Sequence, residues 1–252
     1  MHEPIDPGLP EDALDRAAEV LRQARRVAVL SGAGVSAESG VPTFRGASGL
    51  WEGHAITDVA TPTGFARDPA LVWRFYNARR AALRSVAPNP GHVALAALER
   101  RFANRFTLAT QNIDGLHQAT GSRNVLELHG RLSRVRCTAC AYLADRPGEV
   151  LPDLPHCPEC GSLLRPDVVW FEEMLPHGVW REAYKAAEAC DCFLVVGTSA
   201  VVFPAAGLIE VAAASRARIL EFNLERTAAS LRVDIGLYGP SGRTLPELMR
   251  RL

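Results

Sequence analysis

Apolar residues repeat along the chain with two different spacings. Within residues 12–24 they recur as on one face of a helix, so we predict an amphipathic helix there. Short apolar runs typical of buried strands follow at 26–30, 106–109, 125–128, 193–196 and 219–222. Helical spacing returns between them at 70–85, 92–101, 180–189 and 204–214. Strands that alternate with helices predict an α/β fold, a parallel sheet with helices on both faces.

Polar residues stand directly after each predicted strand. They occupy positions 31–34, 111–114, 129–130, 197–199 and Asn223. In a parallel sheet the carboxyl ends of the strands meet at one edge, which is where ligands bind. A lone histidine is more often structural than catalytic, but His129 shares this edge with the other polar turns. We therefore expect a functional site at this edge of the sheet.

Glycines follow the first predicted strand closely. Gly32, Gly34 and Gly40 would let the backbone approach a pyrophosphate at the start of a helix. The spacing differs from G-x-G-x-x-G because Ala37 holds the position of the third glycine. No acidic residue ends a second strand about twenty residues later, as the dinucleotide fingerprint requires. The pattern alone leaves dinucleotide binding and a plain tight turn both open.

Two C-x-x-C pairs interrupt the alternation of strands and helices. Cys137 and Cys140 form one pair, and Cys157 and Cys160 form the other, inside a stretch (131–165) with little periodic apolar pattern. Four thiolates can close a tetrahedral structural zinc site, and without a signal peptide zinc is favoured over disulfides. Iron could occupy the same thiolates. Few basic or aromatic residues flank the pairs, which argues against a nucleic-acid-binding ribbon.

Composition excludes several classes of partner. The 252 residues are 48% hydrophobic and carry 28 basic and 28 acidic side chains, so the formal net charge is zero. This balance offers no general attraction to nucleic acid or anionic membranes. The N-terminus does not resemble a signal peptide, and the apolar runs are too short to span a bilayer. We expect a soluble, cytoplasmic protein.

Tyr76 and Arg79 lie three positions apart in the predicted helix at 70–85, on one helix face. A guanidinium and a phenol placed together could clamp a carboxylate. The same pattern also fits a core aromatic residue beside a solvated arginine. The spacing alone does not decide between these two interpretations.

From residue 27 to residue 248 the chain resembles the sirtuin family. The resemblance rests on motifs in the family's order: 32–45 (GAGVSAESGVPTFR), 111–114 (QNID), His129–Gly130, both C-x-x-C pairs, 197–199 (GTS) and Asn223. It implies a Rossmann-like large domain made of about 12–44, 86–130 and 170–252. The small domain would have a helical part at about 45–85 and an inserted zinc module at about 131–169.

The resemblance implies NAD as co-substrate, one structural zinc ion and acylated-lysine proteins as substrates. Residues expected to bind NAD are Gly32, Ala33, Gly34, Ser36, Ala37, Glu38, Thr43, Phe44, Arg45, Gln111, Asn112, Ile113, Asp114, Gly197, Thr198, Ser199, Asn223, Glu225 and Ser241. Asn112 and Asp114 would also be catalytic, orienting the nicotinamide ribose. His129 would be the general base, since an imidazole with a pKa of about 6.5 is largely neutral at working pH. The products would be nicotinamide, free lysine and O-acyl-ADP-ribose.

Further residues are expected to contact the acyl-lysine substrate. In sirtuins of the desuccinylase type a tyrosine and an arginine bind the acyl carboxylate, which implies this role for Tyr76 and Arg79, with Ala47 widening the pocket. We therefore expect malonyl-, succinyl- or glutaryl-lysine to outcompete acetyl-lysine. The substrate peptide would run along Val169, Trp170 and Phe171. Glu172 stands where the family usually has glycine and could repel acidic peptides.

Three other functions share these features. A plain NAD-dependent deacetylase and a protein ADP-ribosyltransferase would use the same NAD site. A non-catalytic module could bind acyl-lysine or ADP-ribose without turnover. The presence of His129, Asn112 and Asp114 argues against this last alternative, because a pure binding module needs no general base.

Overall fold

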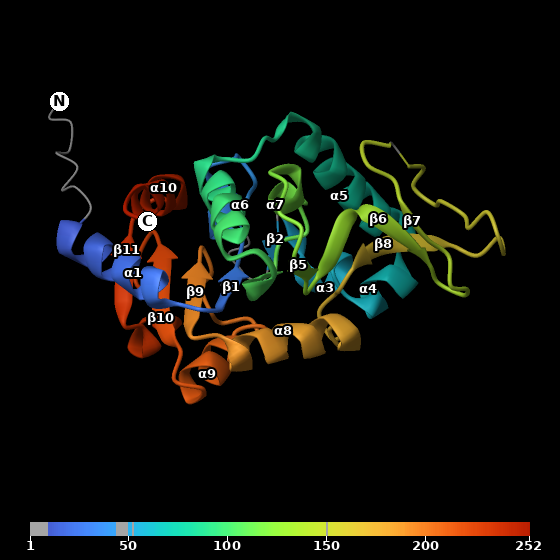
Figure 1. Ribbon diagram of the computed structural model, residues 1–252. Coiled ribbons are helices and arrows are strands. Elements are labelled where there is room, and N and C mark those ends of the chain that lie inside the picture. Colours follow the sequence, from blue (N-terminus) through green and yellow to red (C-terminus); the bar gives the residue numbers. More distant parts are fainter. Residues whose placement is uncertain (1–9, 44–49, 52, 150) are drawn as a thin grey trace, which may run out of the picture.

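The computed structural model describes residues 10–43, 50–51, 53–149 and 151–252. Within these ranges a parallel sheet of six strands has the order β11-β10-β9-β1-β4-β5 (Figure 1). Its strands are β1 (Val27–Ser31), β4 (Phe106–Thr110), β5 (Val125–Glu127), β9 (Cys192–Val196), β10 (Arg218–Asn223) and β11 (Ile235–Tyr238). The prediction of a parallel sheet is confirmed. The edge strand β11 was not predicted, because Gly236 interrupts a short apolar pattern.

Helices cover both faces of this sheet, as its strand sequences require. All five residues of β1 are buried, and alternate side chains of a strand point to opposite faces. Val27 and Val29 pack into the core beneath α1 (Glu11–Gln23), α6 (Pro90–Phe102) and α10 (Ser241–Arg250). Ala28 and Leu30 pack into the core beneath α8 (His177–Ala189) and α9 (Gly207–Ala214). The described helix α9 is shorter than the predicted 204–214.

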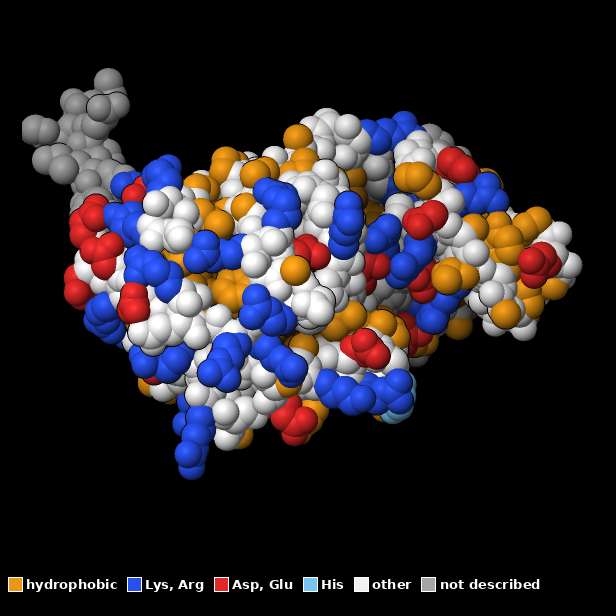
Figure 2. Space-filling view, in the orientation of Figure 1, with side chains coloured by type: hydrophobic (Ala, Val, Ile, Leu, Met, Phe, Trp, Pro, Cys, Tyr) orange, Lys and Arg blue, Asp and Glu red, His pale blue; other side chains and the backbone are white. Residues whose placement is uncertain are grey.

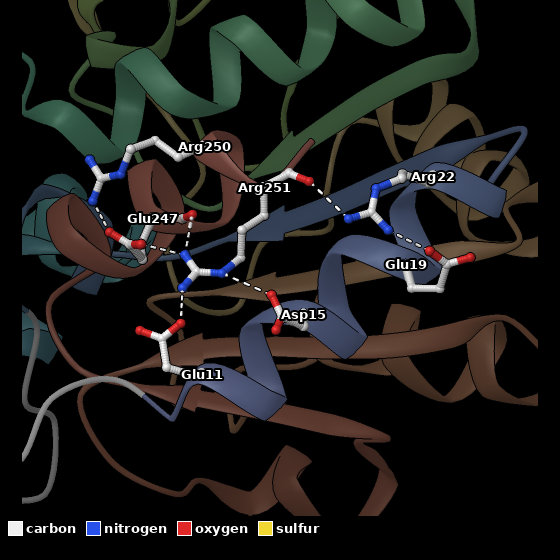
Figure 3. A network of polar contacts seen from close by, with 7 residues as sticks. All are labelled: Glu11, Asp15, Glu19, Arg22, Glu247, Arg250 and Arg251. Atoms are coloured by element: carbon white, nitrogen blue, oxygen red, sulfur yellow. Dashed lines mark hydrogen bonds and ion pairs between the residues drawn. The ribbon is translucent and has the colours of Figure 1, made fainter.

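The first and last helices are joined by a network around Arg251 (Figure 3). Its Nε donates to Asp15 Oδ1 at 3.1 Å, and its guanidinium also contacts Glu11 and Glu247. Arg22 donates to the Arg251 carbonyl at 3.0 Å. These contacts fix α1 against α10.

A smaller part of the molecule lies beyond β5 (Figure 1). It contains β2 (Leu50–Trp51), β3 (His54–Ala55), α3 (Ile56–Val59), α4 (Pro62–Arg67) and α5 (Pro69–Ala82). It also contains an antiparallel sheet, hereafter the small sheet, of β6 (Gly130–Cys137), β7 (Leu143–Asp145) and β8 (Leu164–Val168). Short helices elsewhere are α2 (Gly34–Ala37) and α7 (Leu116–Ala119), and 3-10 turns lie at Leu83–Ser85, Ala103–Arg105 and Ala228–Arg232.

The small sheet gives regular structure to much of 131–165, where the sequence shows little periodic apolar pattern. Arginines occupy several β6 positions and form ion pairs with neighbouring strands, so the strand has few apolar residues. Arg134 Nε lies 2.9 Å from Asp167 Oδ2 and its Nη1 lies 3.2 Å from Glu127 Oε2. The register between β6 and β8 also shifts between Gly130 and Val135, which breaks the two-residue alternation. Both features hide a strand from periodicity analysis.

One face of α5 is bonded to the backbone of the small sheet and its loops. Trp73 Nε1 donates to the Leu164 carbonyl at 2.9 Å, and Asn77 Nδ2 donates to the Leu151 carbonyl at 2.9 Å. Arg80 Nη1 donates to the Leu132 carbonyl at 2.6 Å. These contacts hold α5 in place and leave Tyr76 and Arg79 to line a cavity.

Basic and acidic side chains are both scattered over the face of the molecule shown in Figure 2. This distribution agrees with the formal net charge of zero. Across the described residues, every helix is too short or too polar to cross a membrane.

Candidate active site

A cavity of about 1000 Å³ lies at the carboxyl edge of the parallel sheet and extends to α5. The structure brings most of the predicted site residues to its lining: Gly32, Ala33, Gly34, Thr43, Tyr76, Arg79, Gln111, Asn112, Ile113, Asp114, His129, Val169, Trp170, Phe171, Gly197, Thr198, Ser199, Asn223 and Glu225. Ser36, Ala37, Glu38 and Ser241 do not line it. Phe44, Arg45 and Ala47 lie outside the described residues.

One side of the cavity, the glycine wall, is built from backbone at Gly32, Gly34 and Gly197. Gly34 N donates to the Gly197 carbonyl at 2.7 Å, so the turns after β1 and β9 touch directly. A Cβ added at Gly34 would lie 2.7 Å from the Gly197 carbonyl oxygen. Gly197 has φ +57°, and a Cβ there would lie 2.2 Å from Val35 N. Glycine is therefore required at both positions by close approach of the two turns.

Polar side chains at the ends of β4, β9 and β10 are held in fixed orientations. Gln111 Nε2 donates to Thr198 Oγ1 at 3.0 Å, and Asn223 Nδ2 donates to the Thr198 carbonyl at 2.8 Å. Thr198, which follows β9, is thus bonded to residues at the ends of β4 and β10. A ligand in the cavity would meet polar groups that are already oriented.

Ser36 lies behind the cavity and orients two residues that line it. Its Oγ donates to Asp114 Oδ2 at 2.7 Å and accepts from Asn112 Nδ2 at 3.1 Å. His92 Nδ1 accepts from Asn89 N, so its Nε2 carries the hydrogen and faces Ser36 Oγ at 3.3 Å. Ser36 therefore supports Asn112 and Asp114 through a satisfied hydrogen-bond network.

Glu38 and Ser241 form a second support. Glu38 Oε2 accepts from Gly242 N at 2.6 Å and from Ser241 Oγ at 3.3 Å. These bonds join the turn after α2 to the first turn of α10. A carboxylate is favourable at this end of a helix, where backbone N–H groups are otherwise unsatisfied.

His129 is half-buried in the cavity lining and has a defined tautomer. Its Nδ1 lies 2.9 Å from the Gln111 carbonyl, and a carbonyl can only accept. Nδ1 therefore carries the hydrogen, and Nε2 keeps its lone pair. Burial lowers the pKa of His129, opposed by its bond to the Gln111 backbone. A neutral imidazole with a free nitrogen is suited to accept a proton.

Another part of the cavity lining, the aromatic wall, is built from side chains of Tyr76, Arg79 and Trp170. Trp170 Nε1 donates to the Tyr76 hydroxyl at 3.0 Å. Desolvation by burial raises the pKa of Tyr76, so the phenol keeps its hydrogen. The next segment turns sharply, since Glu172 has φ +72°, a left-handed conformation that glycine adopts more easily.

The four cysteines of the C-x-x-C pairs form one cluster away from this cavity. Their sulfur atoms all lie within 4.8 Å of one another. Cys137 Sγ lies 3.4 Å from Cys160 Sγ, and Cys140 Sγ lies 3.6 Å from Cys157 Sγ. Sulfurs bonded to one tetrahedral zinc ion at about 2.3 Å lie about 3.8 Å apart. The cluster therefore fits a single structural zinc ion with no open position.

Known proteins match almost the whole chain. The Sir2 family model matches residues 32–204. The NAD-dependent protein deacylase 2 of Pyrobaculum aerophilum is 49% identical over 237 residues, covering 93% of this chain and 94% of the relative. The mitochondrial NAD-dependent protein deacylase sirtuin-5 of Canis lupus familiaris is 44% identical over 257 residues, covering 92% and 83%. A solved Sir2 homologue–NAD complex is 43% identical with a TM-score of 0.87, covering 94% of this chain and 92% of that one.

The chain belongs to the Sir2 family. The resemblance to sirtuins drawn from the short motifs is thereby confirmed, and so is the expected fold of a Rossmann-like sheet with a cysteine-containing module. The Sir2 match extends over both the glycine wall and the aromatic wall of the cavity.

Several residues that no sequence motif marks also support this Sir2-family site. His117 is buried beneath it, and its Nε2 lies 2.9 Å from Ser31 Oγ. Burial lowers the pKa of His117 to about 3. Arg165 and Glu173 pair behind Trp170, with Arg165 Nη1 2.6 Å from Glu173 Oε1. No local sequence pattern marks His117, Arg165 or Glu173 as part of the site.

Proposed function

We propose that the protein removes acyl groups from lysine side chains of proteins in an NAD-dependent reaction, and that it prefers acidic acyl groups such as succinyl. The general activity is supported by membership of the Sir2 family and by relatives named NAD-dependent protein deacylases. The observation that carries the acyl preference is the meeting of Tyr76 and Arg79 with His129 in one cavity. Malonyl and glutaryl groups belong to the same proposed substrate class.

The glycine wall is proposed to receive NAD. Gly32, Gly34 and Gly197 line the cavity in the turns after β1 and β9, at the edge where sheets of this kind bind a pyrophosphate. Asn112 and Asp114, held by Ser36, would orient the nicotinamide ribose. Asn223 and Glu225 would lie on the adenosine side of the same cavity.

The proposed chemistry needs one base at a fixed place. When bound, NAD supplies an electrophilic anomeric carbon as nicotinamide leaves, and its ribose becomes the acyl acceptor. His129 Nε2 would take a proton from a ribose hydroxyl, because Nδ1 is committed to the Gln111 carbonyl. One water would be consumed, and the products would be nicotinamide, free lysine and an O-acyl-ADP-ribose.

The aromatic wall is proposed to bind the distal carboxylate of the acyl group. Arg79 would provide a guanidinium and Tyr76 a hydroxyl donor, a combination suited to a carboxylate. An acetyl group has no charge for these residues to recognise. The selectivity therefore depends on the acyl carboxylate alone.

The test is a mass-spectrometric time course with NAD and one lysine peptide in acetyl, malonyl, succinyl and glutaryl forms. We expect faster loss of the acidic groups, with matching O-acyl-ADP-ribose. Arg79→Met should lower the succinyl-to-acetyl ratio of kcat/KM by about tenfold or more, since a hydrogen bond to a charged group contributes about 1.5–3 kcal/mol. Arg74→Met is the matched control, because Arg74 lies on the exposed side of α5 near Asp153.

Two results would contradict this proposal at different levels. Equal turnover of acetyl and succinyl peptides, or a ratio indifferent to Arg79→Met, would remove the acidic preference but keep deacylation. Transfer of labelled ADP-ribose to protein without deacylation would replace the deacylase by a transferase. Absence of nicotinamide release with every peptide would favour a binding module.

A further inference from the structure

Trp170 and Tyr76 form a buried hydrogen bond between residues 94 positions apart. Trp170 is 3% exposed, and none of the Tyr76 surface is exposed, so Tyr76 borders the cavity from within the core. An indole N–H can only donate. The Tyr76 oxygen is therefore the acceptor in this contact, at an Nε1–O distance of 3.0 Å.

This contact restricts where the Tyr76 hydrogen can point. A phenol hydrogen lies near the plane of its ring, and the indole occupies one side of the oxygen. Within the described part of the chain the Tyr76 hydroxyl has no acceptor of its own among the hydrogen bonds. Burial raises the pKa of Tyr76, so the hydrogen is retained at every working pH. The hydroxyl is left as a donor with no acceptor among the described residues, and an acyl carboxylate in the cavity would supply one.

Trp170 itself is fixed from two directions. The Arg165 guanidinium lies 3.4 Å from the centre of the indole ring, which is a close cation–π contact. Arg165 Nη1 and Nη2 donate to the two oxygens of Glu173 at 2.6 and 2.8 Å. Glu173 Oε2 also accepts from Trp170 N at 2.8 Å. Ring and backbone of Trp170 are thus held by the same ion pair.

We propose that Trp170 is a positioning residue for acyl specificity: its indole N–H occupies one side of the Tyr76 oxygen and thereby commits the Tyr76 hydroxyl to donate to an acyl carboxylate. Arg165 and Glu173 keep the indole in this position. The inference rests on the proposed preference for acidic acyl groups and deepens it. Without the indole donor, the hydroxyl is free to rotate, and it loses a defined direction toward the substrate.

The first test compares the succinyl-to-acetyl ratio of kcat/KM in four proteins: the natural chain, Trp170→Phe, Tyr76→Phe and the double variant. A general effect on folding or peptide binding changes both substrates and cancels in the ratio. We expect Tyr76→Phe to lower the ratio about tenfold and Trp170→Phe about fivefold, mainly through KM for the succinyl peptide. In the Tyr76→Phe background, Trp170→Phe should change the ratio by less than about twofold.

Trp73→Phe is the matched control. It deletes another buried indole hydrogen bond, from Trp73 Nε1 to the Leu164 carbonyl at 2.9 Å, without touching Tyr76. It should lower the melting temperature as Trp170→Phe does, while the ratio stays within about twofold of the natural value. An equal fall of the ratio in Trp73→Phe would show that the effect is structural and overturn the inference.

A second measurement needs no turnover. The indole ¹H–¹⁵N resonance of Trp170, identified by its loss in Trp170→Phe, should move upfield and exchange faster with D₂O in Tyr76→Phe. An unchanged resonance would overturn the inference even if a variant proved too unstable for kinetics. If Tyr76→Phe leaves the succinyl-to-acetyl ratio unchanged, the proposed acyl preference fails. If Tyr76→Phe lowers it but Trp170→Phe does not, the preference stands and the role of Trp170 fails.

Discussion

The glycine wall and the aromatic wall line a single cavity but are built in opposite ways. The glycine wall is backbone, and its turns touch where Gly34 N bonds to the Gly197 carbonyl. The aromatic wall is made of side chains, and Tyr76 takes its orientation from Trp170, 94 residues away. A backbone wall is specified by the absence of side chains. The aromatic wall depends on the contacts that hold α5 and the small sheet in place.

Removing zinc is the most severe test of whether the two walls are held independently. Structural zinc contributes about 10–16 kcal/mol to folding in small zinc-binding peptides, which matches or exceeds the free energy of unfolding of most domains. The small sheet carries the cysteine cluster and accepts hydrogen bonds from Trp73 and Arg80 of α5. Chelation should therefore disorder the aromatic wall and lower succinyl turnover about a hundredfold or more. The affinity for NAD, measured by calorimetry, should change less than about tenfold.

Readdition of zinc is the control for this experiment, and it should restore turnover. Parallel loss of NAD affinity and succinyl turnover would show that the two walls are not independent. Unchanged turnover after complete metal removal would show that the small sheet holds α5 without the ion.

The glycine wall can be broken separately by Gly34→Ala. The new Cβ would lie 2.7 Å from the Gly197 carbonyl oxygen and 2.8 Å from Gly197 Cα, so the two turns must separate. We expect a loss of about 1–3 kcal/mol in the free energy of unfolding. The Kd for NAD should rise about tenfold or more, while the succinyl-to-acetyl ratio stays constant.

Gly178→Ala is the matched control for this substitution. A Cβ at Gly178, in the first turn of α8, meets no atom within 4 Å. Its stability should change by less than about 1 kcal/mol and its NAD affinity should not change. A shift in acyl selectivity in Gly34→Ala would mean that the glycine wall also shapes the acyl site.

The contrast between the two walls also explains which parts of the structure could be predicted from the sequence. The main sheet was predictable because β1 and β9 are continuous apolar runs followed by polar turns. The glycine wall was recognisable because short, contiguous motifs encode it. The support of the aromatic wall was not, because Arg165 and Glu173 are unremarkable charged residues until folding places them against Trp170. Tyr76 and Arg79 entered through a family resemblance, since their helical spacing alone left two interpretations open.

Some predicted residues also have contacts that spacing could not show. Ser36 supports Asn112 and Asp114 from behind the cavity, and Glu38 bonds to the first turn of α10. Glu172 adopts a positive φ, which explains in physical terms why glycine is easier at that position. Each of these facts depends on the packing of segments distant in sequence.

The smallest expected effect is that of pH, because burial lowers the pKa of His129 and raises the pKa of Tyr76. Burial lowers the pKa of His129 below its ordinary value of about 6.5, so the base stays neutral at that pH. Burial raises the pKa of Tyr76, so the hydroxyl stays a donor at alkaline pH. An acyl carboxylate has a pKa of about 4–5, close to the value of about 4.3 for a glutamate side chain. We therefore expect kcat/KM for succinyl and acetyl peptides to vary less than about threefold between pH 6.5 and 8.5.

Below this range stability should fall before the aromatic wall titrates. His117 has a pKa lowered to about 3, against about 6.5 when unfolded, so the unfolded chain binds more protons between these values. Its contribution is complete above pH 6.5 and is lost progressively as the pH decreases toward 3. Melting temperatures measured beside kcat/KM separate unfolding from loss of the base. An acid limb centred above pH 6.5 for both peptides would contradict the buried, neutral His129. An acid limb near pH 4–5 seen only with the succinyl peptide would report protonation of its acyl carboxylate, because the glycine wall and His129 serve both substrates alike.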